Sequence, residues 1–219
     1  MSLVPKPRLA LLVSGNGTNL AAVIEACTDG RLHAEVALVV SNRPEAYALQ
    51  RAGSAGIATL VASHLDRDRA SYDHELAYSV AAYDVDLVIL AGWDRILTSH
   101  FVAHHTTINL HPAAPGTFPG LGAIKKAHDA WERGEISHGG VMVHYVPDEG
   151  VDDGPVIGWE PVPFLHGDTL DTYEQRVHEI EHQLLVESIA TTLDRGTSKR
   201  PLPNQTLAGT SSNELTSRT

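Results

Sequence analysis

Apolar residues along the chain gather in short continuous runs, and the stretches between the runs mix apolar and polar residues. Four runs fit strands in the first part of the chain, at residues 8–14, 35–41, 57–61 and 85–90. The stretches between them have helical composition, at about 20–26, 45–55 and 68–82. Uninterrupted apolar strands are typical of a parallel sheet that is buried on both faces. The alternation of strand and helix predicts a doubly wound, Rossmann-like α/β fold.

The second part of the chain departs from this alternation. Three further strands are predicted, at residues 106–110, 141–146 and 155–163. Since no long helix separates the last two, we expect the carboxyl-terminal part of a mostly parallel sheet to be antiparallel. A long helix fits residues 170–193, and residues 195–219 are polar with almost no large apolar side chain. We therefore predict a single domain over residues 1–194 and a disordered tail over 195–219.

Composition narrows the class of partner. The 219-residue chain has 27 acidic and 16 basic residues and a net charge of −11. This balance argues against nucleic acid as a partner, because a nucleic-acid surface needs clustered Lys and Arg. The single cysteine, Cys27, excludes a disulfide within the chain and fits a reducing compartment. Residues 1–7 carry no apolar signal core, and no apolar run is long enough to span a bilayer. We expect a soluble, cytoplasmic protein without membrane contact; its oligomeric state is not readable from the sequence.

A short glycine-containing loop, Gly15-Asn-Gly-Thr-Asn19, lies between the first strand and the first helix. Glycine lets a backbone approach an anion closely, and a helix N-terminus offers unpaired N–H groups. A dinucleotide motif would have a third glycine where this chain has Leu20, so the loop favours a single phosphate over a dinucleotide. The alternative is an ordinary tight turn in which Thr18 or Asn19 caps the helix.

A second group of polar residues, Asn109 and His111, follows a predicted strand and precedes Pro112. Residues two apart on an extended segment point to the same side, so an amide and an imidazole would face one cleft. Asn can donate a hydrogen bond to a developing oxyanion, and His can carry a proton near neutral pH. A carboxylate from Asp152 or Asp153 beside His111 would raise the pKa of the imidazole. The alternatives are a packing histidine and an Asp-Gly turn.

A third pattern, His178-Glu-Ile-Glu-His182, has the spacing of a zinc-binding helix. In that interpretation Glu179 stands between the two histidines, and His166 is the nearest candidate for a third ligand. Surface His and Glu are common on an acidic terminal helix, so we favour the interpretation without metal.

Five motifs occur in one order along the chain, at residues 14–19, 91–97, 109–112, 140–145 and 151–154. Together they resemble the phosphoribosylglycinamide formyltransferases, a family of 10-formyltetrahydrofolate-dependent enzymes of purine biosynthesis. The resemblance covers about residues 8–193. It is closest to the fungal form at 140–145 and 173–178.

The resemblance implies that a formyl group moves from 10-formyltetrahydrofolate to the amine of phosphoribosylglycinamide by direct attack, with neither a metal nor a covalent enzyme intermediate. It implies a catalytic role for Asn109, His111 and Asp152. It implies that the ribonucleotide substrate is bound by Gly17, Thr18, Asn19 and Glu181. It implies that the folate is contacted by Arg69, Asp94, Arg95, Ile96, Leu97, Asn109, Pro147, Asp148 and Glu149.

The chain departs from the family pattern in three places. Residues 113–116 read Ala-Ala-Pro-Gly where bacterial members often have Ser-Leu-Leu-Pro, and Asp94 replaces an apolar residue. The loop from Tyr145 to Asp152 is one residue longer than usual, so either Asp152 or Asp153 could be the catalytic acid. We choose Asp152, because one residue and then Gly154 follow it, as in the family.

Two other classes of function remain as alternatives. One is a sibling enzyme, a formyltetrahydrofolate hydrolase or a methionyl-tRNA formyltransferase. Both normally carry an extra domain, and the acidic charge disfavours tRNA. The other is a nucleotide-binding module without catalysis, which would lack working acid–base groups in its cleft.

Overall fold

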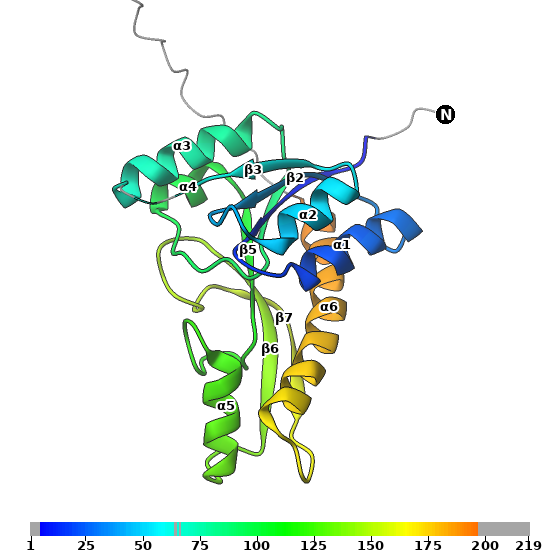
Figure 1. The fold of residues 1–219 in the computed structure, drawn as a ribbon, viewed down its shortest axis with the longest axis vertical. Helices are drawn as coiled ribbons and strands as arrows, with labels where there is room; N and C mark the ends of the chain where they lie inside the picture. Colours follow the sequence, from blue (N-terminus) through cyan, green and yellow to red (C-terminus); the bar gives the residue numbers. More distant parts are fainter. Residues whose placement is uncertain (1–4, 64, 66, 197–219) are drawn as a thin grey trace, which may run out of the picture.

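A seven-stranded sheet forms the centre of the protein, in the order β3-β2-β1-β4-β5-β6-β7 (Figure 1). The computed structural model describes residues 5–63, 65 and 67–196. The strands are β1 (Arg8–Val13), β2 (Glu35–Ser41), β3 (Ala58–Val61), β4 (Leu87–Leu90), β5 (Thr107–His111), β6 (His138–Tyr145) and β7 (Val156–Pro163). The helices are α1 (Thr18–Asp29), α2 (Tyr47–Ser54), α3 (Arg69–Ala81), α4 (Ser99–His104), α5 (Ala123–Glu132) and α6 (Leu170–Asp194).

The pairing of the strands confirms the predicted fold class. Strands β1 to β5 are mutually parallel, whereas β6 pairs antiparallel with both β5 and β7. The polar tail expected after α6 lies outside the described residues from 197 onward. In the described part of the chain, no helix combines the length and the apolar character that a membrane span requires.

Two helices, α4 and α5, are absent from the sequence prediction. Helix α4 has six residues, three of which are not apolar, so it is too short to show a helical period. Helix α5 follows the Gly- and Pro-rich residues 112–122 and buries only a narrow stripe that consists mostly of alanine. Both helices lie on the connections around β5, which therefore carry more regular structure than expected.

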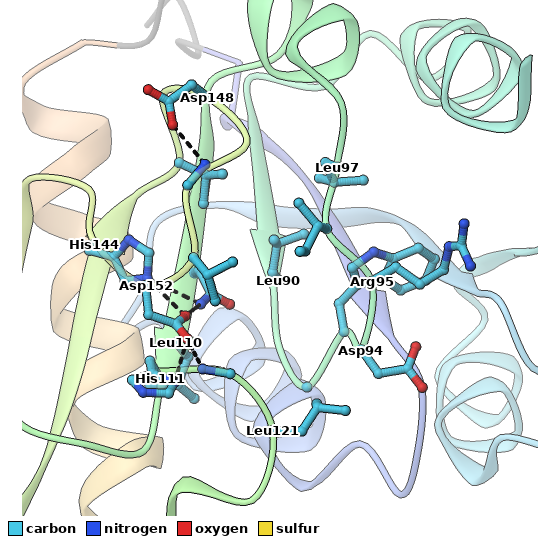
Figure 2. Close-up of a pocket in the computed structure, with 18 residues that line it drawn as sticks. Leu90, Asp94, Arg95, Leu97, Leu110, His111, Leu121, His144, Asp148 and Asp152 are labelled. Atoms are coloured by element: carbon cyan, nitrogen blue, oxygen red, sulfur yellow. Dashed lines mark hydrogen bonds and ion pairs between the residues drawn. The ribbon is translucent and has the colours of Figure 1, made fainter. Parts of the chain in front are cut away.

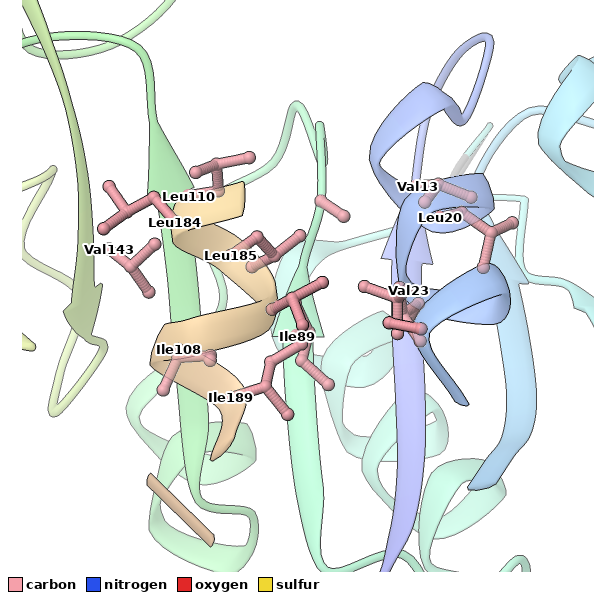
Figure 3. Close-up of a cluster of buried hydrophobic side chains, with 14 of the residues drawn as sticks. Val13, Leu20, Val23, Ile89, Ile108, Leu110, Val143, Leu184, Leu185 and Ile189 are labelled. Atoms are coloured by element: carbon pink, nitrogen blue, oxygen red, sulfur yellow. The ribbon is translucent and has the colours of Figure 1, made fainter. Parts of the chain in front are cut away.

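The helices cover the two faces of the sheet unequally. Side chains from α1, α2, α5 and α6 belong to one buried cluster with Ile108 and Leu110 of β5. Figure 3 shows the part of this cluster that α1 and α6 form with the central strands. The opposite cluster, which includes α3 and α4, takes residues from β1, β2 and β4 but none from β5 or β6. Because side chains alternate along a strand, Asn109 and His111 point to this second face. Helical cover of that face therefore ends beside the predicted catalytic residues.

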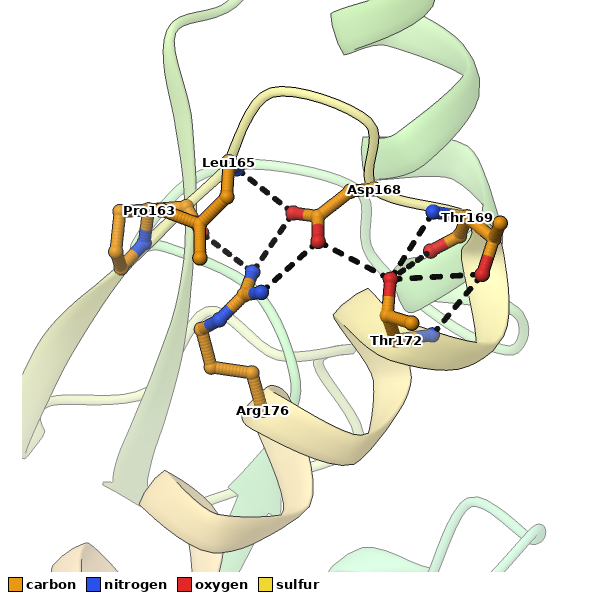
Figure 4. Close-up of polar contacts among 6 residues, drawn as sticks. All are labelled: Pro163, Leu165, Asp168, Thr169, Thr172 and Arg176. Atoms are coloured by element: carbon orange, nitrogen blue, oxygen red, sulfur yellow. Dashed lines mark hydrogen bonds and ion pairs between the residues drawn. The ribbon is translucent and has the colours of Figure 1, made fainter.

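The N-terminus of α6 is anchored by a polar network (Figure 4). The hydroxyl of Thr169 accepts from the N–H of Thr172, and the Thr172 hydroxyl accepts in return from the N–H of Thr169, which forms a capping box. Asp168 accepts two hydrogen bonds from Arg176, at 2.8 and 2.9 Å. These bonds fix where α6 begins, and they thereby place Glu181 further along the helix.

Candidate active site

The carboxylate of Asp152 lies at the centre of the site (Figure 2). Its Oδ1 accepts from Nδ2 of Asn109 at 2.9 Å, and its Oδ2 lies 3.3 Å from Nδ1 of His111. The backbone N–H of Gly120 also donates to Oδ2, at 2.8 Å. The side chains of His111 and Asp152 are only 5% and 10% exposed. The three residues predicted as a catalytic trio thus meet at one point, although they come from a strand and a distant loop.

Asp152 and Asp153 occupy different surroundings. Asp152 has φ 55, a left-handed conformation that Asp adopts more readily than most residues. This conformation directs its carboxylate back to β5. Asp153 is exposed, and its carboxylate lies beside Gly150 of its own loop. The geometry therefore favours Asp152 as the acid that acts with His111.

His144 is a fourth polar member of the site that the sequence interpretation missed. It lies opposite Asn109 in the antiparallel pair β5–β6, and its Nε2 is 3.1 Å from Nδ2 of Asn109 and 3.5 Å from Oδ1 of Asp152. Its side chain is 3% exposed. The alternation along residues 141–145 carried the signal, because buried Val141 and Val143 face α6 and His144 must then face away.

The amide of Asn109 differs from the expectation that it is free to donate to an oxyanion. Its Nδ2 faces both Asp152 and His144, so both amide hydrogens have acceptors within the protein. The reverse orientation would place the amide oxygen against the Asp152 carboxylate. Donation to a substrate oxygen would therefore require one hydrogen to leave its present acceptor.

The pKa of His111 shifts in the opposite direction to the sequence prediction. Burial, the largest influence, lowers the pKa of the imidazole from its ordinary value of 6.5. The carboxylate of Asp152 and the carbonyl oxygen of Phe118 act in the opposite sense and only partly offset burial. The expectation of a raised pKa was wrong, because it counted the charge and not the desolvation. His111 is neutral in the resting site at neutral pH.

Asp152 remains ionised although it is largely buried. Burial by itself would raise the pKa of this carboxyl group. The hydrogen bond from the N–H of Gly120 and the adjacent rings of His144 and His111 outweigh burial and leave the pKa below its ordinary value. The site therefore pairs a carboxylate with a neutral imidazole.

A cavity of about 310 Å³ opens beside this cluster, at the lower end of the range for small-molecule sites. It is lined by the site residues and by the segment 92–97 that follows β4. Leu90, Leu97 and Val146 give it an apolar wall. Of the residues expected to contact a folate, those that line it are Asp94, Arg95, Ile96, Leu97, Asn109 and Asp148.

Three expected folate contacts do not line the cavity: Arg69, Pro147 and Glu149. Arg69 instead donates to the carbonyl oxygens of Ile96 and Leu97, each at 3.1 Å, and to the carboxylate of Glu149 at 2.8 Å. Glu149 also accepts from the N–H and the hydroxyl of Ser99, at 3.0 Å each. In this structure the Arg69–Glu149 pair supports the cavity wall from behind.

Asp94 and Arg95 are also held by the protein. The Asp94 carboxylate accepts from Ser14 at 3.0 Å and from Asn42 at 2.7 Å, and it pairs with Arg43. The guanidinium of Arg95 lies 4.7 Å from the ring centre of Tyr72. Although Asp94 lines the cavity, its carboxylate is turned toward the ends of β1 and β2.

The glycine loop lies at the carboxyl end of β1 and does not contribute to the cavity lining. Helix α1 begins at Thr18, and its N-cap is Gly17, with φ 75 and no side-chain cap. The alternative that Thr18 or Asn19 caps the helix is therefore wrong. Nδ2 of Asn19 instead donates to Oε2 of buried Glu181 at 3.1 Å, which joins two of the residues predicted to bind the ribonucleotide.

The residues of the zinc-like pattern make other contacts. Nδ1 of His178 is 2.7 Å from Glu181, and its Nε2 is 3.6 Å from Glu174. Both ring nitrogens therefore face carboxylates rather than a site shared with His182. Within the described residues, the cluster that meets the spacing for a metal lies elsewhere, on α5, and consists of His128, Asp129 and Glu132.

Comparison with known proteins gives consistent matches. A family model described as Formyl transferase matches residues 7–189. The chain is 42% identical over 197 residues to phosphoribosylglycinamide formyltransferase of Dictyostelium discoideum, a match that covers 83% of this chain and 95% of that protein. It is 40% identical over 196 residues to the Schizosaccharomyces pombe protein of the same name, with coverage of 83% and 94%. The crystal structure of glycinamide ribonucleotide transformylase 1 from Symbiobacterium toebii matches with a TM-score of 0.78 at 38% identity, over 84% of this chain and 86% of that one.

Proposed function

The chain belongs to the formyl transferase family, and on this basis we propose that it transfers the formyl group of 10-formyltetrahydrofolate to the amine of phosphoribosylglycinamide. This reaction is a step of purine biosynthesis. The observation that carries the proposal is the convergence of Asn109, His111 and Asp152 beside an open cavity. Acyl transfer needs a proton carrier and an oxyanion donor at one carbon atom, and these side chains offer both.

The reaction begins when the substrate amine attacks the formyl carbon. A new C–N bond forms, and the carbonyl oxygen takes up the negative charge of a tetrahedral intermediate. The amine must lose a proton, and neutral His111 can accept it once its unprotonated ring nitrogen turns from its present neighbour toward the substrate. The resulting imidazolium is stabilised on both sides, because Nδ1 faces Asp152 at 3.3 Å and Nε2 faces the carbonyl oxygen of Phe118 at 3.2 Å.

The second half of the reaction breaks the bond between the formyl carbon and N10 of the folate. N10 must leave protonated, and the imidazolium of His111 can return the proton to it, directly or through water. Asn109 can donate to the oxyanion if one amide hydrogen turns from Asp152 or His144 to the substrate. A role of this kind explains why the amide lies at the edge of the cavity.

The two substrates occupy neighbouring parts of the site in this proposal. The folate lies in the cavity against segment 92–97. The ribonucleotide places its phosphate on the loop of Gly17, Thr18 and Asn19, and Glu181 also contacts it. The hydrogen bond between Asn19 and Glu181 supports this arrangement, because it joins the loop to α6.

The test is an absorbance assay for tetrahydrofolate release, run with and without phosphoribosylglycinamide. We expect release only when the amine is present. Release at the same rate in water alone would instead indicate a hydrolase. The variant His111→Asn should keep its affinity for both substrates and lose turnover by about 100- to 1000-fold, the usual cost of removing a group that acts in the transition state. Undiminished turnover would contradict the proposed mechanism.

A further inference from the structure

Helix α2 supports the glycine loop from one side. The N–H of Ala48 donates to the carbonyl oxygen of Gly15 at 3.2 Å. The guanidinium of Arg51 donates twice to Asn16, from Nε to the carbonyl oxygen at 2.9 Å and from Nη2 to the side-chain Oδ1 at 2.8 Å. Gly17 packs so closely that a Cβ atom there would lie 2.6 Å from the Cβ of Ala48. Helix α2 therefore contacts the loop at Gly15, Asn16 and Gly17.

These contacts determine where the N–H groups of the loop point. In a trans peptide the C=O and the following N–H point in opposite directions. Because α2 binds the carbonyl oxygens of Gly15 and Asn16, the N–H groups of Asn16 and Gly17 point away from α2. In the part of the chain that the structure describes, neither N–H donates to a protein acceptor. Two free N–H groups in succession, followed by the N-terminus of α1, form an anion-binding concavity.

We propose that Arg51 is a positioning residue for the substrate phosphate, an inference that rests on the proposed function. By binding the carbonyl oxygen and the side chain of Asn16 at once, it holds the peptides of the loop in the orientation that presents their N–H groups to the phosphate. The inference adds the N–H of Asn16 to the groups that contact the phosphate.

The role depends on the shape of the side chain as well as on its charge. The planar guanidinium donates two hydrogen bonds in a fixed geometry, which a lysine ammonium cannot reproduce. The Arg51 guanidinium also lies 4.8 Å from the ring centre of Tyr47 on the same helix, which restricts it further. Arg51 thus joins α2 to the loop through a contact of fixed geometry.

Steady-state kinetics of the full-length protein can test the inference with two substrates, phosphoribosylglycinamide and its analogue without the phosphate. Replacing Arg51 by Met should raise KM for the phosphorylated substrate by about tenfold, the value of a lost charge-assisted hydrogen-bond pair. It should leave kcat and KM for 10-formyltetrahydrofolate unchanged. With the analogue, the wild-type protein and Arg51→Met should have the same kcat/KM. Arg51→Lys should recover only part of the loss.

Two results would overturn the inference: an unchanged KM for phosphoribosylglycinamide, or an equal loss with both substrates, which would indicate a general structural defect. Arg133→Met is the matched control, because Arg133 makes a similar two-pronged contact with Glu135 on an exposed turn. It should behave as the wild type.

A measurement without turnover separates this inference from the proposed function. Inorganic phosphate should raise the Tm of the wild-type protein more than that of Arg51→Met. Equal shifts would overturn the role of Arg51 even if the transferase reaction is observed. Absence of turnover by the wild-type protein would overturn the proposed function alone. If Arg51→Met does not fold, Asn16→Ala removes only the bond to Oδ1 and should raise the same KM by a smaller factor.

Discussion

Asn109 and His144 lie opposite each other on β5 and β6, and Nδ2 of Asn109 is 3.1 Å from Nε2 of His144. The other ring nitrogen of His144 lies 2.8 Å from the carbonyl oxygen of Tyr145, which can only accept. A neutral His144 therefore carries its proton on Nδ1 and accepts from Asn109 at Nε2. In this way His144 holds the amide in the orientation that also serves Asp152.

We expect His144→Phe to lower kcat by about 10- to 100-fold, because Asn109 loses an acceptor that orients it. The pKa of Asp152 should rise, since the adjacent ring of His144 is one of the influences that lower it. The pH dependence of kcat measures both effects. His138→Phe, at the exposed start of the same strand, is the control. If the two variants have equal kcat, His144 has no part in the reaction.

The pH dependence of the reaction should reflect a neutral His111. Because burial lowers the pKa of this imidazole from 6.5, kcat should fall on the acid side only below pH 6.5. A profile in which activity requires the protonated form, and falls as pH rises through this range, would contradict the assignment.

The free energy of unfolding should also depend on the titration of His111. The folded state favours neutral His111, so this contribution to the free energy of unfolding is present above pH 6.5. It is lost as the pH falls from 6.5 toward the lowered pKa of the folded state. Denaturant titrations should therefore show that the free energy of unfolding of the wild-type protein falls relative to that of His111→Asn as the pH decreases through this range. A difference between the two proteins that does not change with pH would show that His111 makes no such contribution.

The two adjacent aspartates provide an internal comparison. Asp152→Asn removes the charge that stabilises the imidazolium of His111, so we expect kcat to fall by about 100- to 1000-fold. Asp153→Asn changes an exposed side chain and should leave kcat near that of the wild type. Single-turnover kinetics of the two variants decide the matter, and a larger loss in Asp153→Asn would reverse the assignment.

The ion pair Arg69–Glu149 should influence folate binding, because Arg69 holds the segment that lines the cavity. Glu149→Gln weakens the contacts with Arg69 and with the N-terminal residue of α4, Ser99. We expect KM for 10-formyltetrahydrofolate to rise several-fold, roughly the cost of one charge-assisted hydrogen bond, while KM for phosphoribosylglycinamide stays constant. Glu160→Gln, on the exposed strand β7, is the control. A rise in both KM values would show that the effect is not local.

The polar network at the N-terminus of α6 should contribute measurably to the free energy of unfolding. The pKa of Asp168 is held well below its ordinary value, first by the hydrogen bonds from Arg176 and also by the N–H of Leu165 and by Thr172. Asp168→Asn should lower the free energy of unfolding by about 1–3 kcal/mol at neutral pH. Because the folded pKa is depressed, this difference should shrink as the pH falls below 3.8, where the unfolded carboxyl group is protonated. A difference that is independent of pH would exclude the carboxylate as its cause.

The sequence predicted the fold class well, because β1, β2 and β4 are continuous apolar runs and helices alternate with them. It also predicted that Asn109 and His111 share a side of β5, because this requires only the two-residue period of a strand. The sequence did not indicate α4 and α5, whose apolar stripes are too short to show a period.

The other differences between the sequence prediction and the structure concern pKa shifts and hydrogen-bond partners, both of which depend on the folded environment. Desolvation decides the direction in which the pKa of His111 shifts, and the pattern of residues along the chain does not reveal how deeply the imidazole is buried. The partners of Asp94 could not be predicted from the sequence either. Ser14, Asn42 and Arg43 approach Asp94 only when β1, β2 and β4 lie side by side. The alternation of residues 141–145 gives the face of His144, but its place opposite Asn109 depends on the pairing of β5 with β6, which the sequence pattern does not give.

The uneven distribution of helices over the sheet has a consequence for ligand binding. On the face that carries Asn109 and His111, α3 and α4 cover the sheet only as far as β4, and the apolar side chains of Leu90, Leu97 and Val146 border the gap. A flat aromatic ligand that enters this gap takes the position that another helix would occupy in a symmetrical sandwich. In the proposed complex, the folate would therefore cover apolar side chains that in the free protein border an open cavity.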